Sequence, residues 1–142
     1  MAAGPITSFI GDIAGQVDNG HVSNCAALNP AITGYGFETE FGRVAGANSG
    51  TLNNNIAWDG MSAEGGVSFW GLNTGSGVDG EDIDKNNATT QATYQNAPLS
   101  GLGWDFNSAA PVWKWGSSGY DLPVLNWQTE MPLPATPAHL LP

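Results

Sequence analysis

The sequence predicts an all-β protein built from short, repeated strands. Three observations lead to this prediction: Gly accounts for 20 of the 142 residues, apolar and polar residues alternate over three to five positions, and a pattern recurs after about thirty residues. Dense Gly disfavours helices, and alternation is the periodicity of a strand with one buried face. A hydrophobic content of 41% supplies enough apolar area for a folded core.

Two segments of the chain, 10–27 and 41–57, align with each other. They share an apolar-Gly-x-apolar-Ala-Gly run, a small-Gly turn, an apolar residue two positions later and an Asn two positions after that. The offset between equivalent positions falls from 31 to 30 at the turn, because the second turn is one residue shorter. One segment alone cannot bury its own apolar residues. The pattern therefore predicts that the segments stack as rungs of a parallel β-helix, or solenoid, and share one core.

Small residues and corner amides support this interpretation. A narrow interior is expected to hold the small residues Ala14, Ala26, Ala45 and Ala57. Asn24 and Asn54 occupy equivalent corners, where their side chains can hydrogen-bond along the stack and where Asn tolerates a positive φ. The alternative is a β-sandwich or meander in which two hairpins happen to be similar.

The sequence predicts four parts of the chain, and a change of composition at Gly65 marks the boundary between the two central ones. The four parts are a lead-in (1–9), the rungs (10–64), a C-terminal capping segment (65–128) and a Pro-rich tail (129–142). A cap is needed because the last rung of a solenoid would otherwise expose unpaired backbone groups.

The capping segment is rich in aromatic residues. Strand-like pieces are expected at 67–70, 102–106, 112–115 and 122–127, and one stretch, 81–96, could form a helix. The predicted fold class is therefore all-β: short parallel β-helix rungs, an aromatic C-terminal cap and at most one short helix.

The repeats resemble GLUG repeats, whose pattern is roughly Gly-Gly-Leu-Val-Gly-x-Asn-x-Gly-x-Ile-x-Asn-Cys-Tyr-Ala. The resemblance is carried by Ile10-Gly-Asp-Ile-Ala-Gly and Asn19-Gly-His-Val-Ser-Asn-Cys-Ala-Ala, and by Phe41-Gly-Arg-Val-Ala-Gly and Ser49-Gly-Thr-Leu-Asn-Asn-Asn-Ile-Ala. Both segments lack the paired Gly before the apolar residue, and Ala26 or Ile56 stands where Tyr is usual.

The C-terminal half is similar to the segment that closes such arrays. Its matching residues are Gly103-Trp104-Asp105-Phe106, Val112-Trp113 and Tyr120-Asp121-Leu122-Pro123. The resemblance implies right-handed β-helix rungs in a bacterial cell-surface or secreted protein. It also implies an extracellular location and a structural or adhesive role.

The charge balance excludes several kinds of partner. Three Lys and Arg against thirteen Asp and Glu give a net charge of −10. So few cations cannot neutralise a run of phosphates, and nucleic acid is not expected as a partner. No apolar run approaches the ~20 residues of a membrane span, and no signal peptide is expected at the N-terminus. The expected partners are a host or environmental glycan or protein, or neighbouring domains of a longer chain.

Enzymatic activity is not expected from this sequence. Neither His21 nor His139 lies near a Gly-x-Ser-x-Gly turn, and the single Cys25 is expected to be a small buried residue. Glu38 and Glu40 alternate on one strand, about 7 Å apart, which could suit a glycan-acting enzyme. A solvated loop is the favoured interpretation of that pair.

The densest set of oxygen ligands consists of Asp79, Glu81, Asp82 and Asp84. Calcium binds six to eight such oxygens, so these four are the candidate metal ligands, and no other cofactor is expected. The alternative is the capped, acidic start of a helix, because Asn87 and Thr93 stand where an EF-hand loop requires Gly and Glu.

Six Trp residues make carbohydrate binding a second functional hypothesis, since indole faces stack on sugar rings. Trp58 and Trp115 are the candidate ligand-binding residues. Trp104, Trp113 and Trp127 are expected to lie in the core of the cap, where each would bury a large apolar area.

Overall fold

The computed structural model describes residues 8–33, 39–64, 70–95, 101–117 and 121–128. The described chain is all-β, with thirteen short strands and two helices of four residues each. The expectation of at most one helix is therefore wrong. Contacts divide the chain into two compact units, Met1–Ala88 and Thr89–Pro142. The composition changes at Gly65, whereas the contacts divide the chain after Ala88.

Ten strands of the first unit form two sets of five, which we call the first repeat (8–33) and the second repeat (39–64). The first repeat contains β1 (Ser8–Gly11), β2 (Ala14–Val17), β3 (His21–Ser23), β4 (Ala26–Ala27) and β5 (Ala31–Thr33). The second repeat contains β6 (Thr39–Gly42), β7 (Ala45–Asn48), β8 (Thr51–Asn53), β9 (Ile56–Trp58) and β10 (Ser62–Glu64).

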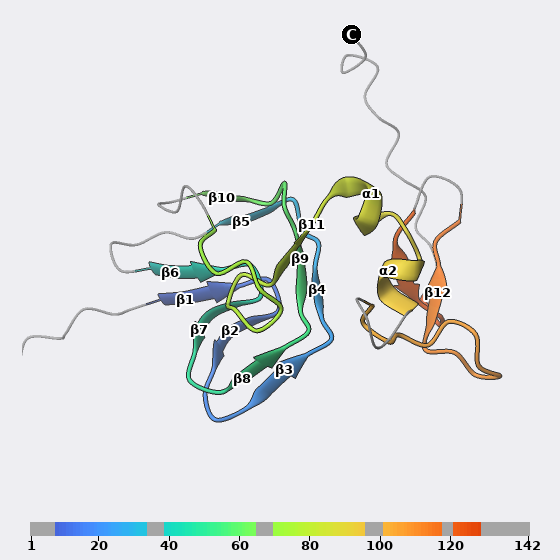
Figure 1. The fold of residues 1–142 in the computed structure, drawn as a ribbon, viewed down its shortest axis with the longest axis horizontal. Coiled ribbons are helices and arrows are strands. Elements are labelled where there is room, and N and C mark those ends of the chain that lie inside the picture. Colours follow the sequence, from blue (N-terminus) through green and yellow to red (C-terminus); the bar gives the residue numbers. More distant parts are fainter. Residues whose placement is uncertain (1–7, 34–38, 65–69, 96–100, 118–120, 129–142) are drawn as a thin grey trace, which may run out of the picture. The chain divides into compact units, whose positions relative to one another are not determined.

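Each strand of the first repeat pairs with its counterpart in the second, in the same order along the chain (Figure 1). All five pairs are parallel. Ile10 lies opposite Phe41 and Val22 lies opposite Leu52, so the strand register keeps both offsets of the sequence pattern. The alternative of two similar hairpins is wrong, because the strands of a hairpin run antiparallel.

Apolar side chains from both repeats form one shared core. The fully or nearly buried members are Val17, Ala27, Ile32, Val44, Ala45, Leu52, Ala57 and Met61. Ala45 and Ala57 have no exposed surface, as predicted. Ala14 is only half-buried, and Ala27 rather than Ala26 occupies the buried place beside Ala57.

The predicted ladder of corner amides is present. Asn54 Nδ2 donates a hydrogen bond to Asn24 Oδ1 at 2.8 Å, and both residues have a positive φ, at 51° and 55°. Gly also recurs at the corners for a steric reason: a Cβ on Gly11 would lie 2.2 Å from the Ala14 carbonyl oxygen, and one on Gly42 would lie 2.0 Å from that of Ala45. The two repeats therefore turn at equivalent places.

The segment after the second repeat covers part of that repeat's far edge. The Val78 carbonyl accepts hydrogen bonds from Val44 N (2.8 Å) and Ala45 N (3.0 Å). β11 (Glu81–Ile83) then pairs in parallel with β9, and α1 (Lys85–Ala88) follows. The helix expected over 81–96 is therefore wrong in its first part. Pairing with the edge of β9 outweighs the helical tendency of this short acidic stretch.

The second unit contains α2 (Ala92–Gln95) and the antiparallel pair β12 (Trp113–Trp115) and β13 (Pro123–Leu125). The strands expected over 112–115 and 122–127 are confirmed in their central residues. No strand forms over 102–106, because the Leu102 and Trp104 amides donate to carbonyls of α2. Of the expected strand 67–70, residues 67–69 lie outside the described residues.

Candidate functional site

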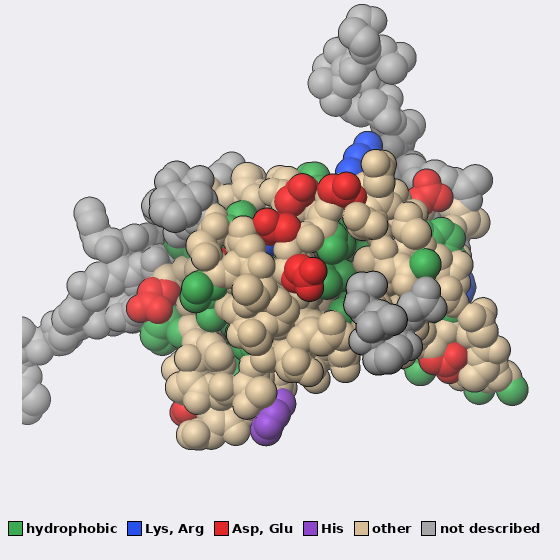
Figure 2. Space-filling view, in the orientation of Figure 1, with side chains coloured by type: hydrophobic (Ala, Val, Ile, Leu, Met, Phe, Trp, Pro, Cys, Tyr) green, Lys and Arg blue, Asp and Glu red, His purple; other side chains and the backbone are tan. Residues whose placement is uncertain are grey.

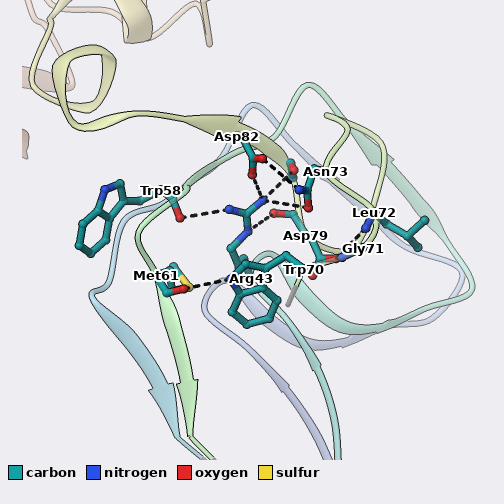
Figure 3. Close-up of polar contacts among 10 residues, drawn as sticks. Arg43, Trp58, Met61, Trp70, Gly71, Leu72, Asn73, Asp79 and Asp82 are labelled. Atoms are coloured by element: carbon teal, nitrogen blue, oxygen red, sulfur yellow. Dashed lines mark hydrogen bonds and ion pairs between the residues drawn. The ribbon is translucent and has the colours of Figure 1, made fainter. Parts of the chain in front are cut away.

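The most deeply buried charge in the described part of the chain is the guanidinium group of Arg43, whose side chain is 0% exposed. Arg43 follows β6, and its side chain lies among backbone carbonyls of later segments (Figure 3). Nε donates to the Asp79 carbonyl at 2.9 Å, and the terminal nitrogens donate to those of Trp58 (3.1 Å) and Gly80 (3.3 Å). One side chain thus fastens three backbone positions from two segments.

The side chains of Asn73, Trp70 and Asp82 surround Arg43 and form with it what we call the arginine cluster. Arg43 forms an ion pair with Asp82, whose side chain is 46% exposed, and it donates to Asn73 Oδ1 at 3.3 Å. Asn73 Nδ2 in turn donates to Asp82 Oδ2 at 2.9 Å. The Trp70 ring lies 5.7 Å from the Arg43 Cζ atom, within the range of a cation–π contact. A buried guanidinium group requires this many partners because desolvating its charge is costly.

Asp79 holds the loop that presents these carbonyls. The residue is 5% exposed, and its Oδ2 atom accepts hydrogen bonds from the backbone N–H groups of Gly71 (3.0 Å) and Leu72 (2.9 Å). Among the described residues, every buried side-chain nitrogen and oxygen has a hydrogen-bond partner. The buried polar groups around Arg43 are therefore satisfied by the chain itself.

The four candidate metal ligands have separate roles in the structure. Asp79 binds backbone amides, Asp82 pairs with Arg43, and Asp84 Oδ1 accepts the Asn87 amide at 2.7 Å as a helix cap. Glu81 is exposed in β11, and acidic side chains gather on the face shown in Figure 2. Nowhere in the described ranges do three or more His, Cys, Asp or Glu side chains form a group that could hold a metal ion.

The other candidates for chemistry differ in their exposure. Glu40 is exposed in β6, and Glu38 lies outside the described residues. Cys25 is half-buried; burial raises the pKa of its thiol, so less of the reactive thiolate is present. His21 is exposed on β3. In the segments that the structure describes, no helix is long and apolar enough to cross a membrane.

Trp58, the first candidate ligand-binding residue, is half-buried at the end of β9 and packs against the core. Its indole lies so close to Gly60 that a Cβ there would meet the ring Cζ2 atom at 2.5 Å. In Figure 3 the ring points away from Arg43, although the Trp58 carbonyl binds that residue. Trp58 is thus anchored at its backbone and partly accessible at its ring.

Trp115, the second candidate, belongs to an aromatic cluster in the second unit. The Trp104 and Trp113 rings stack at 4.0 Å with an interplanar angle of 10°. Tyr94 is fully buried and contacts Trp104 and Trp115 with ring centroids 5.3 and 5.9 Å away. Phe106 packs on Trp115 at 6.3 Å. Burial raises the pKa of Tyr94 to about 12.

The expectation for the cap's core is only partly correct. Trp104 and Trp113 are half-buried against each other, but Trp127 is 80% exposed and is therefore not a core residue. Trp127 follows β13, where the Gln128 amide donates to the Leu125 carbonyl at 2.8 Å and the chain turns. Because of this turn, Trp127 does not continue the alternation of side-chain faces along β13, and its side chain is exposed.

Comparison with family models, curated proteins and solved structures gives no match. The sequence did not lead us to expect a special role for Arg43, the central residue of the arginine cluster. Arg43 is one of only three Lys and Arg residues, and it stands where Asp12 stands in the first repeat. A lone cation at a repeat position that elsewhere holds an acid is the signal that could have indicated a special role.

Proposed function

We propose that this chain is a non-enzymatic structural and adhesive module of a bacterial surface or secreted protein. In this proposal the two repeats are rungs of a short right-handed parallel β-helix, and the arginine cluster closes its C-terminal end. The partners would be a host or environmental glycan or protein, or neighbouring domains of a longer chain.

One observation carries this proposal: five consecutive strands pair in parallel, and in order, with the next five. Such order arises when a chain coils and each circuit stacks on the one before. The right hand follows the strong preference of parallel crossover connections. Arg43 and Asp79 bind backbone groups and Asp82 pairs with the Arg43 side chain, which supports a scaffold role. The extracellular bacterial location rests on the resemblance to GLUG repeats.

Cross-linking tests the stacked arrangement. With Cys25 replaced by Ser, a Ser23→Cys/Asn53→Cys pair joins positions that are opposite each other in the β3–β8 register. Neighbouring strands lie about 4.8 Å apart, inside the range of Cα separations that a disulfide spans. We expect rapid disulfide formation under mild oxidation.

The matched control is His21→Cys/Asn53→Cys, two residues out of register. Its Cα atoms are separated by about 8 Å, beyond the reach of a disulfide. Equal rates for the two pairs would contradict the stacked rungs. Release of reducing sugar from a glycan panel by the purified chain would contradict the non-enzymatic role.

Carbohydrate binding is the second candidate function, and the 80% exposure of Trp127 favours it. An indole this exposed offers a face on which a sugar ring can stack. Titration of intrinsic Trp fluorescence with a glycan panel tests this function. Trp127→Ala is expected to weaken any binding, as are Trp58→Ala and Trp115→Ala at the two predicted positions. Val112→Ala, at another exposed position, is the control.

A further inference from the structure

The two ends of the stacked repeats differ. The second repeat is partly covered on its far side, since the Asn55 amide donates to the Gly75 carbonyl and β11 pairs with β9. The first repeat has no such cover: within the described residues, β1 to β5 each pair with one strand, always on the side of the second repeat. We call the unpaired side of β1 to β5 the open edge.

Hydrogen bonds identify backbone groups that point to the open edge. The Gly20 carbonyl accepts from Thr51 N at 2.9 Å, and Asn24 N donates to the Asn53 carbonyl at 3.1 Å. The residues that flank β3 therefore direct these backbone groups at the second repeat. The N–H groups of the intervening residues, His21 and Ser23, point the opposite way. Such rows of edge N–H groups template the addition of another strand.

The open edge lacks the features that usually prevent strand addition. β1 to β5 contain no Lys, Arg, Asp, Glu or Pro. Proteins commonly place charged residues or Pro on exposed edges to block pairing. Ile10, Ala14 and Val22 are half-buried and pack against the shared core, so apolar surface extends toward this edge. The open edge thus combines hydrogen-bond donors with apolar surface.

We propose that the open edge is a docking surface for a further parallel β-rung of the same period. This inference rests on the proposed function, because it extends the same stack by one circuit. The occupant is indicated by continuity with the interface between the two repeats: a third rung at the same spacing along the chain would repeat its register. A second copy cannot offer its matching face, since residues 75–83 cover part of it.

A tandem duplication tests the docking surface. A copy of residues 8–38, inserted directly before Ser8 of the full chain, supplies a rung at the spacing of the β1–β6 pair. Amide hydrogen exchange at His21 and Ser23 then reports whether the rung docks. We expect exchange at both amides to slow by at least about tenfold relative to the unmodified chain. We also expect the melting temperature of the first unit to rise.

The matched control carries the same insertion with Val22→Asp in the added copy alone, which places a charge in that rung's interior. No slowing is expected in this control. Unchanged exchange at His21 and Ser23 in the duplicated chain, with protected amides at Val22 and Asn24, would overturn the docking proposal and leave the β-helix intact. Unprotected Val22 and Asn24 amides in the unmodified chain would instead overturn the β-helix itself. Dimers of the unmodified chain in which His21 and Ser23 are protected would identify a second copy as the occupant and overturn the proposed one.

Discussion

Asp12 and Arg43 occupy the same position in the two repeats but have opposite environments. The Asp12 carboxylate accepts hydrogen bonds from the backbone and side-chain nitrogens of Asn29, near the surface. The Arg43 side chain is buried among the carbonyls of a later segment. The difference follows from what lies next to each repeat, because only the second repeat is followed by a segment rich in acceptors. Repeat position alone therefore does not determine whether a polar residue is buried.

Arg43→Met is expected to lower the free energy of unfolding of the first unit by about 3 kcal/mol. Met fills a similar volume but leaves the carbonyls of Asp79 and Gly80 without their donor. Urea denaturation measures the change. Glu40→Gln is the control, since it removes an exposed charge of the same unit and should change stability by less than about 0.5 kcal/mol. Equal effects would contradict a role for the buried position.

Two substitutions of Asn54 separate the contribution of its hydrogen bond from that of its positive φ. Asn54→Gly removes the hydrogen bond to Asn24 but allows the positive φ, and should cost about 1 kcal/mol. Asn54→Ala also strains the backbone and should cost about 1–2 kcal/mol more. Thermal and urea unfolding of the two variants give the difference. If Ala proves no worse than Gly, the corner does not require a left-handed backbone.

At the scale of elements, the repeat could be predicted because its information is local. Paired features such as Asn24 and Asn54, or Gly11 and Gly42, recur at nearly constant spacing, and the structure places each pair in equivalent corners. β11 could not be predicted in this way, since it lies outside the repeat and its strand form depends on the free edge of β9. The offset between β11 and β9 follows neither repeat period, so no internal alignment reveals it.

Ala45→Leu is expected to destabilise the first unit by about 1–3 kcal/mol. Ala45 is fully buried in β7 opposite Ala14, and three added carbon atoms must displace packed neighbours. Ala47→Leu, on the same strand but half-buried, is the comparison and should cost less. Urea unfolding measures both. A neutral Ala45→Leu would mean that this part of the interior can expand.

At the scale of the whole molecule, the chain consists of two units with different cores. The first packs aliphatic side chains, among them the small Ala27 and Ala57, between parallel strands, whereas the second contains stacked rings. The aromatic content of the second unit predicted an apolar cluster but did not indicate which residues form it. Phe106 and Tyr94 join through loops and a helix of one turn, and Trp127 is excluded by a turn. Such loop geometry leaves no periodic trace in a sequence.

The stability of the second unit should decrease between about pH 10 and pH 12. Burial raises the pKa of Tyr94 to about 12 from an ordinary value of 10. In this window the unfolded chain releases the phenol proton while the folded chain retains it, so rising pH favours unfolding. Near-UV circular dichroism with urea, near pH 9 and near pH 11, measures the decrease. Tyr94→Phe should reduce the pH dependence, and an unchanged dependence would assign it to other groups.

The shorter turn at Ser49–Gly50 has a consequence for how such a chain tolerates insertions and deletions. Paired residues are 31 positions apart in the β2–β7 pair (Ala14 and Ala45) and 30 apart in the β3–β8 pair (Val22 and Leu52). The strands before and after the turn nevertheless remain paired. A residue gained or lost at this corner is therefore absorbed there. One gained inside β8 would instead reverse the faces of that strand and bring Leu52 to solvent. Length variation among homologous repeats should accordingly concentrate at corners, and a search that assumes a fixed period will lose the repeat after a single gap.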